Sequence, residues 1–193
     1  IGAALDTLLG MDALVGRNYT HLLGESEDRV HSLWKKKLED DGWVFEKGKC
    51  SRRCVLRCEK TPVSPRGKKL YPVEFELLVF LGTNLGFHDL EGVSEAVRLC
   101  DDLGLDGIET GAAIAVLLEH NDKRGEEPTF GLDRDRLLGL IRDAAGGSGA
   151  YGEMLGGGAS YVAEKLGAPD LAVTYKKLSY AAYPLFNPGA AFS

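Results

Sequence analysis

The strongest constraint on the fold is a succession of apolar residues at helical spacing, interrupted again and again by glycine. The 193 residues include 25 glycines, many of which follow an apolar stripe directly, where the left-handed C-cap of a helix would lie. Apolar residues make up 44% of the chain and charged residues 27%, as in ordinary folded proteins. We therefore predict an all-α fold that is mostly helical, with short irregular or extended pieces around residues 43–75.

Residues that favour helix ends set the positions of the expected helices. Asp89 resembles an N-cap for a helix that runs towards Gly104, and Asp133 resembles an N-cap for a helix over residues 134–145. Further helices are expected at residues 5–16, 27–41, 112–120 and 152–166, with Ser26 as the N-cap of the second and Thr110 as that of the third.

The segments between these helices are less regular. Residues 43–45 suit a short extended piece, and residues 59–70, which contain two prolines and a glycine, suit a loop. Residues 74–81 fit a strand or a helix equally well by their periodicity. The tail at 175–193 has aromatic residues and prolines but no period, and the chain shows no internal repeat. We expect a single helical domain over residues 1–193.

The charge of the chain is unevenly distributed. Its net charge of −6 argues against a protein that binds nucleic acid through general basicity. The segment at residues 47–69, however, holds nine Lys or Arg and one acid, Glu59. Such a segment suits attraction to an anionic group or an acidic partner, although on charge alone a solvated loop is the simpler interpretation. No apolar run approaches the ~18 residues of a membrane span, so we expect no membrane partner.

Three of the four cysteines lie close together inside this basic segment. Cys50, Cys54 and Cys58 follow the pattern Cys-x3-Cys-x3-Cys, whereas Cys100 stands apart in a hydrophobic pattern. Clustered thiols in a chain without a secretory signal favour metal over disulfides, either an iron–sulfur cluster or zinc with a fourth ligand. A continuous helix would place Cys50 and Cys58 about 12 Å apart, so the segment must fold back if all three are ligands. The alternative is three free thiols in an exposed loop.

Five segments, in order along the chain, resemble the aldehyde:ferredoxin oxidoreductase family. Residues 16–19 are similar to the family's Thr-Arg-Asn-Phe, and the three cysteines follow. Pro-Val-Glu-Phe-Glu at residues 72–76 is similar to Gly-Pro-Glu-Tyr-Glu, and residues 81–86 are similar to Leu-Gly-Ser-Asn-x-Gly. Residues 99–111 are similar to Leu-Cys-Asp-x-Leu-Gly-Leu-Asp-Thr-Ile-Ser-Thr-Gly. The tail resembles the family more loosely, with Lys-Lys-Leu at residues 176–178 and Tyr-Pro-Leu-Phe-Asn-Pro-Gly at residues 183–189 against the family's Lys-Gly-Leu-Glu and Tyr-Asp-Pro-Arg-Gly.

The resemblance implies a place for two cofactors, because enzymes of this family carry tungsten or molybdenum on two pterins beside a [4Fe–4S] cluster. The pterin residues would be Asp101, Gly104, Leu105 and Asp106. A carboxylate can accept paired hydrogen bonds from the N–H donors of a pterin edge, and a glycine lets the backbone approach the ring. From the residues alone, the same segment fits a helix that ends at a glycine C-cap followed by an apolar anchor.

The resemblance also assigns metal and catalytic roles. Cys50, Cys54 and Cys58 would be cluster ligands, although the family spacing of Cys-x2-Cys-x3-Cys places the usual first ligand at Ser51. Glu76 matches the active-site glutamate, whose pKa would be raised in an apolar pocket and which could then exchange a proton with an oxygen derived from the aldehyde. An exposed position on an amphipathic segment is the alternative for Glu76.

Some members hold an interface metal through Glu-x-x-His. Glu95 matches the glutamate of that motif, but Arg98 stands at the position of the histidine, so we do not expect that metal. An arginine at this surface can form an ion pair instead.

The parent protein implied by the resemblance oxidises aldehydes to carboxylic acids and passes electrons through the cluster to ferredoxin. The chain corresponds to the helical middle region, so the pterin-covering domain and the C-terminal part, with the fourth cluster ligand, would come from missing domains or a partner subunit. The start at Ile1 also suggests a cut piece, and the absence of a secretory signal suggests a cytoplasmic protein. A homodimer is compatible with this interpretation, and no nucleic acid is expected. The alternative is a non-catalytic helical module that binds an iron–sulfur cluster or zinc, for electron relay or assembly.

Overall fold

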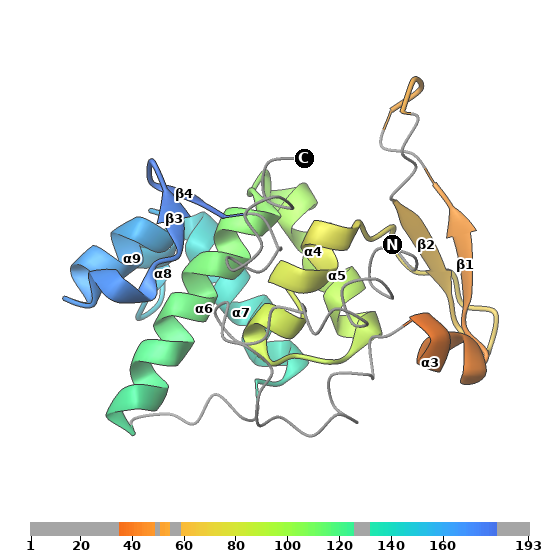
Figure 1. Ribbon diagram of the computed structural model, residues 1–193, viewed down its shortest axis with the longest axis horizontal. Coiled ribbons are helices and arrows are strands. Elements are labelled where there is room, and N and C mark those ends of the chain that lie inside the picture. Colours follow the sequence, from red (N-terminus) through yellow and green to blue (C-terminus); the bar gives the residue numbers. More distant parts are fainter. Residues whose placement is uncertain (1–34, 49–50, 55–58, 126–131, 181–193) are drawn as a thin grey trace.

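The computed structural model of the chain describes residues 35–48, 51–54, 59–125 and 132–180 (Figure 1). Cys50, Cys58, the expected helix at residues 5–16, the segment at 16–19 and most of the expected helix at 27–41 lie outside these ranges. In chain order the elements are α3 (Lys35–Asp40), β1 (Val44–Lys47), β2 (Lys60–Val63), α4 (Phe75–Phe80), η3 (Thr83–Leu85), α5 (Leu90–Leu103), α6 (Gly107–Arg124), α7 (Arg134–Gly146), α8 (Gly152–Leu155), α9 (Ala159–Lys165), η4 (Pro169–Leu171), β3 (Thr174–Tyr175) and β4 (Leu178–Ser179). The described part is therefore mostly helical, as the sequence predicts, with two small antiparallel sheets added.

The caps of α5 and α7 are those that the sequence predicts. The side chain of Asp89 accepts a hydrogen bond from Glu91 N, and that of Asp133 accepts one from Arg136 N. Each helix ends at a glycine in the left-handed region, Gly104 with φ +70° and Gly147 with φ +59°. A side-chain N-cap stabilises a helix by about 1 kcal/mol, because it satisfies a backbone N–H that has no partner inside the helix.

Helix α6 is the central element of the structure, and its start differs from the prediction. It begins at Gly107 and is capped by Asp106, not by Thr110. One oxygen of Asp106, Oδ1, accepts from Ile108 N at 2.9 Å and from Glu109 N at 3.1 Å. Every residue from 110 to 118 is buried, so neighbours cover α6 on all sides over this stretch (Figure 1).

Residues 74–81, which fit a strand or a helix by sequence, form the helix α4, because this segment packs against α6. Glycines on α6 make the close approach possible. A Cβ at Gly107 would lie 2.7 Å from Leu77 Cδ2, and one at Gly111 would clash with the backbone carbonyl of Phe80. As a helix, this segment buries four apolar side chains between α4 and α6 and in the surrounding core: Phe75, Leu78, Val79 and Phe80.

Where one continuous helix is expected at residues 152–166, the structure has two short helices, α8 and α9, so the predicted continuity is wrong. The break lies at Gly156, Gly157 and Gly158, where the chain turns from α8 to α9. Gly158 has φ +84°, and a Cβ at Gly156 would lie 2.9 Å from the carbonyl oxygen of Ala144 on α7. The glycines therefore allow α8 to pack closely against α7, where a continuous helix would turn away.

Two predicted loops contain strands. Within residues 59–70, β2 pairs antiparallel with β1, and Lys47 lies opposite Lys60. In the tail, β3 and β4 form a hairpin through Lys176 and Lys177, which have φ values of +52° and +68°. Both ribbons are too short to leave a periodic signal in the sequence. The extended piece predicted at residues 43–45 is present as the start of β1.

The segment after β2 runs along α5 and is fastened to it. Ser94 Oγ donates to the backbone oxygen of Tyr71 at 2.9 Å, and Lys68 Nζ lies 3.0 Å from a carboxylate oxygen of Glu91. Within the described residues, no helix is both long enough and apolar enough to cross a membrane.

Candidate functional site

The four residues expected to hold a pterin lie together at the connection between α5 and α6. Asp101 is in the last turn of α5, Gly104 is its C-cap, and Asp106 is the N-cap of α6. Leu105 N donates to the carbonyl oxygen of Cys100 at 2.9 Å, which is a Schellman-type helix end. The C-cap interpretation of this segment is therefore correct, and it leaves both carboxylates exposed at the surface.

Each of the two carboxylates uses one oxygen within the protein. Asp106 Oδ1 accepts hydrogen bonds from the N-terminal amides of α6. Asp101 Oδ2 accepts one from the hydroxyl of Tyr71, with an O–O distance of 2.8 Å. Within the described part of the chain, Asp101 Oδ1 and Asp106 Oδ2 receive no hydrogen bond. Apart from Gly104 and its two neighbours in the chain, no described residue has an atom within 4 Å of the place where a Cβ of Gly104 would be. The connection thus presents two acceptor oxygens beside an open stretch of backbone.

The hydrogen bond from Tyr71 fixes the orientation of Asp101. Because the phenol donates to this carboxylate, the pKa of Tyr71 is raised above its usual value of 10.0, and burial and the charges of Asp101 and Asp102 act in the same direction. The backbone of Tyr71 is in turn held by Ser94. Sequence reasoning did not identify Tyr71, since nothing in its local pattern distinguishes it from a surface aromatic residue.

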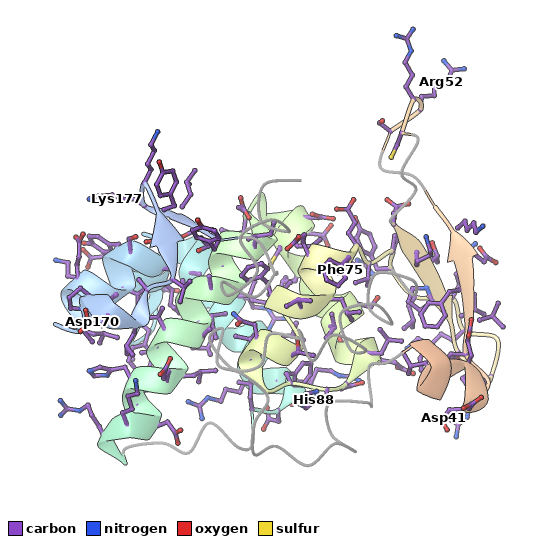
Figure 2. The ribbon with its side chains drawn as sticks, viewed as in Figure 1. Asp41, Arg52, Phe75, His88, Asp170 and Lys177 are labelled. Atoms are coloured by element: carbon purple, nitrogen blue, oxygen red, sulfur yellow. The ribbon has the colours of Figure 1, made fainter. Side chains whose placement is uncertain are left out.

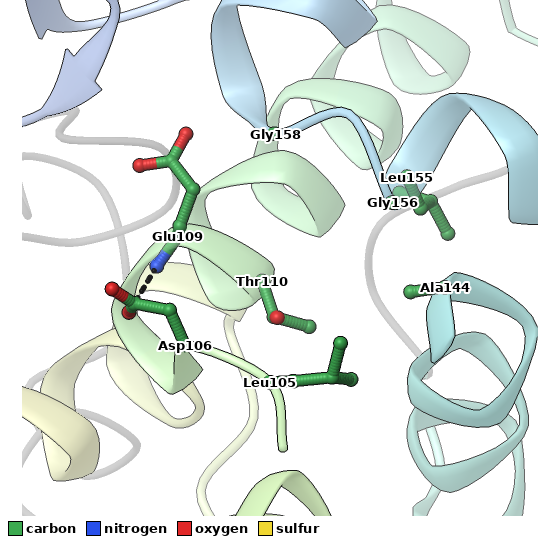
Figure 3. A pocket seen from close by; sticks show the side chains of 8 residues that line it. All are labelled: Leu105, Asp106, Glu109, Thr110, Ala144, Leu155, Gly156 and Gly158. Carbon is green, nitrogen blue, oxygen red and sulfur yellow. Dashed lines mark hydrogen bonds between the residues drawn. The ribbon is translucent and has the colours of Figure 1, made fainter. Parts of the chain in front are cut away.

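Leu105 and Asp106 also line a pocket of about 110 Å³ (Figure 3). Its other walls come from Glu109 and Thr110 on α6, from α7, and from the glycine turn between α8 and α9. The lining combines apolar side chains with the carboxylates of Asp106 and Glu109 and with the backbone of Gly156 and Gly158. Such a pocket suits a small polar edge rather than a whole large ligand.

Glu109 is a second residue that the sequence analysis missed. Its Oε1 accepts from Ala159 N at 2.8 Å and its Oε2 accepts from Ser179 N at 3.0 Å. Ala159 begins α9, and Ser179 ends β4. A glutamate three residues after an N-cap is a helix-start pattern, but its partners lie 50 and 70 residues away, so no local signal could have found these contacts.

Glu76, the predicted catalytic residue, lies in the first turn of α4 and is half-buried. It does not line the pocket described above. Its neighbour Leu77 packs against Gly107, the first residue of α6, so α4 adjoins the α5–α6 connection. Glu76 therefore lies one residue before Leu77, which contacts the start of α6 next to the pterin motif, but it is not in the same pocket as that motif.

Of the three clustered cysteines, only Cys54 is described; it is half-buried and follows a turn in which Cys54 N donates to Ser51 O. The ends of this segment are brought together, because Gly48 N donates to Glu59 O at 3.1 Å beside the paired strands. Figure 2 shows Arg52 where this loop projects beyond the β1–β2 pair. The described residues contain no group of three His, Cys, Asp or Glu that could hold a metal, but that set excludes Cys50 and Cys58.

Cys100 serves the core. Its side chain is buried, and desolvation, together with the charges of Asp101 and Asp106, raises the pKa of its thiol to about 12. The thiol is therefore protonated at neutral pH and behaves as a small apolar group.

At the surface of α5, Arg98 pairs with Asp102 on its own helix, with Nε 3.4 Å from Oδ2. Glu95 lies 3.9 Å from Nη1 of Arg134 on α7. Both charged residues of the Glu-x-x-Arg sequence thus have partners within the chain.

Comparison with known proteins identifies the family. The family described as "Aldehyde ferredoxin oxidoreductase, domains 2 & 3" matches residues 3–190. The tungsten-containing aldehyde ferredoxin oxidoreductase of Pyrococcus furiosus is 31% identical over 137 residues, and that of Thermococcus kodakarensis is 30% identical over 137 residues. Each comparison covers 67% of this chain, and the chain spans 23% of the length of these relatives. The chain therefore belongs to the aldehyde ferredoxin oxidoreductase family.

Proposed function

We propose that this chain is the helical middle domain, folded as a single unit over residues 1–193, of a tungsten-containing enzyme that oxidises small aldehydes to carboxylic acids. The relatives that support this proposal are named as tungsten-containing aldehyde ferredoxin oxidoreductases. The overall reaction converts an aldehyde and water to a carboxylic acid, with release of two electrons and two protons. When bound, the tungsten on its pterins supplies the redox chemistry, and molybdenum is the alternative metal.

The α5–α6 connection fits one edge of a pterin. Asp101 Oδ1 and Asp106 Oδ2 can accept from ring N–H donors, and charge-assisted hydrogen bonds of this kind are among the stronger ones. The open space at Gly104 lets the ring approach the backbone. This pairing of two half-used carboxylates with an open glycine is the observation that carries the proposal.

The other site residues follow from the same assignment. Glu76 is proposed to hold or deliver a proton at the substrate oxygen, from the helix that adjoins the pterin motif.

Cys50, Cys54 and Cys58 are proposed to bind a [4Fe–4S] cluster, with a fourth ligand from another domain or a partner subunit. Arg52 and Arg53, both exposed, would offset the negative charge of a thiolate-bound cluster. Electrons would leave through this loop to a ferredoxin, in a cytoplasmic protein for which a homodimer is one arrangement.

The test starts from the intact protein that contains this chain, purified without oxygen and analysed for Fe, W, Mo, Zn and pterin. We expect iron with tungsten or molybdenum. Asp101→Asn should weaken pterin retention about tenfold, because it removes a charged acceptor while keeping the side-chain size. Asp102→Asn is the matched control, since Asp102 is also exposed but pairs with Arg98. Equal pterin retention in the two variants would contradict the assignment of Asp101.

Glu76→Gln gives a separate test of the catalytic role. It should abolish turnover while both metals stay bound, since the amide cannot exchange a proton in the same way. Unchanged turnover would remove Glu76 from the mechanism.

A second function, a non-catalytic module that binds a cluster or zinc, is favoured by one observation. Gly48 N donates to Glu59 O beside the paired strands β1 and β2, so these strands alone bring together the two ends of the segment that carries the cysteines. Zinc as the sole metal, with no pterin and no visible absorbance, would support this alternative.

A further inference from the structure

Glu109 binds the N-terminus of α9 in place of a local cap. Gly158 stands at the N-cap position of α9 and has no side chain that could accept from the first amides. Glu109 Oε1, reaching across from α6, accepts from Ala159 N at 2.8 Å. A carboxylate at a helix N-terminus is favourable both as a hydrogen-bond acceptor and as a charge near the positive end of the helix dipole.

The second oxygen of Glu109 binds the hairpin. Oε2 accepts from Ser179 N at 3.0 Å, so the same side chain holds β4. Two other side-chain contacts link the hairpin to α9: the Ser160 and Thr174 hydroxyls are 3.0 Å apart, and Lys177 Nζ lies 3.7 Å from Glu164. The Lys177 pair is exposed, and such pairs contribute little to stability. Glu109 therefore links both α9 and the hairpin to α6 through one charged group.

Glu109 also spans the pocket beside the pterin motif. Its backbone N–H donates to Asp106 Oδ1 at 3.1 Å, on one wall of the pocket (Figure 3). Its carboxylate lies beside Gly158, on the opposite rim, where an added Cβ would approach Glu109 Oε1 to 2.8 Å. One residue thus connects the wall that carries Asp106 with the rim formed by the start of α9.

We propose that Glu109 is a positioning residue that fixes the start of α9 and the β3–β4 hairpin as the far rim of the pocket that Asp106 lines. The role of the rim in retaining a pterin rests on the proposed function. The link between α6, α9 and the hairpin does not, and it can be tested by itself.

The first experiment measures hydrogen exchange in the intact protein, in peptides that contain the amides of Ala159 and Ser179. Glu109→Ser should speed exchange in both peptides about tenfold, since each amide loses a charged acceptor. Glu109→Gln keeps the size and one carbonyl acceptor, so only one of the two peptides should exchange faster. Glu153→Gln is the matched control, because Glu153 is exposed on α8 and should leave both rates unchanged. Unchanged exchange in Glu109→Ser would overturn the proposal.

The second measurement is pterin retained per protein after gel filtration, with iron content as the internal reference. Glu109→Ser should lower the pterin several-fold at constant iron, and Glu153→Gln should leave it unchanged. Full pterin retention together with fast exchange would overturn the role of the rim. If the wild-type protein contains no pterin, the proposed function fails, while the hydrogen-exchange results still decide whether Glu109 holds α9 and the hairpin.

Discussion

At the scale of single residues, side chains at the α5–α6 connection serve the fold with one atom and leave another available. Asp106 caps α6 through Oδ1 alone, and Asp101 receives the Tyr71 hydroxyl through Oδ2 alone. A carboxylate has more acceptor positions than either contact uses. The same aspartates can therefore stabilise the helix ends and bind a ligand, and the structural and functional interpretations of this segment do not exclude one another.

Tyr71 should report the state of Asp101. Its pKa is raised above 10.0, mainly because the protonated phenol donates to the Asp101 carboxylate. The contact stabilises the fold fully below the phenol pKa of the unfolded chain, and this contribution is lost as the pH rises through the folded pKa. In an ultraviolet titration, with Tyr71→Phe subtracted to isolate the signal, Asp101→Asn should lower the Tyr71 pKa. Asp102→Asn should change it less, and an unaltered pKa in Asp101→Asn would contradict the hydrogen bond.

At the scale of elements, close helix contacts depend on where glycine lies. Gly107 and Gly111 face α4, and Gly152 and Gly156 face α7, each at a spacing of four residues on its own segment. Residues at this spacing share one face of a helix, so each pair opens a flat strip along which a neighbouring backbone can approach. The segment at 152–158 shows that the glycines which looked like helix interior are packing positions.

Gly111→Ala should destabilise the protein by about 1–3 kcal/mol, since the added Cβ would clash with the Phe80 carbonyl between α4 and α6. Gly139→Ala is the matched control: Gly139 lies within α7, and no atom lies within 4 Å of its added Cβ. That change should stabilise the protein by about 0.5–1 kcal/mol through helix propensity. Urea unfolding measures both, and equal effects of the two substitutions would argue against the close contact.

At the scale of the whole molecule, charge is segregated. Outside residues 47–69 the chain is acidic overall, whereas Arg52 lies beyond the paired strands β1 and β2 (Figure 2), and Arg53 follows it in the sequence. The far end of α6 lies on the opposite side of the molecule (Figure 1). An exposed cationic loop on an anionic body attracts an acidic partner to one place and repels it elsewhere.

Under the proposed function, electron transfer to an acidic acceptor protein should therefore depend on these arginines. Arg52→Gln/Arg53→Gln in the intact protein should lower the second-order rate several-fold at low salt, with the difference fading as salt screens the charges. Lys123→Gln/Arg124→Gln removes the same charge from the far end of α6 and should have little effect. Rates that fall equally in both double variants would show that net charge, not the loop, controls the encounter.

The sequence by itself determined the local features. Asp89 and Asp133 as N-caps, Gly104 and Gly147 as C-caps and the α5–α6 motif were all predictable, because each depends on residues within one or two turns of one another. The start of α6 was missed because Asp106 was interpreted as a ligand residue, and its capping contact is just as local.

Only the tertiary structure decided the rest. The choice of helix at residues 75–80 depended on the packing of α4 against α6, and the break at residues 156–158 depended on a close approach to α7. The contacts of Tyr71 with Asp101 and of Glu109 with Ala159 and Ser179 join positions 30, 50 and 70 residues apart. No pattern within a few turns records such contacts, because they arise only when separate elements pack and leave their polar groups facing one another.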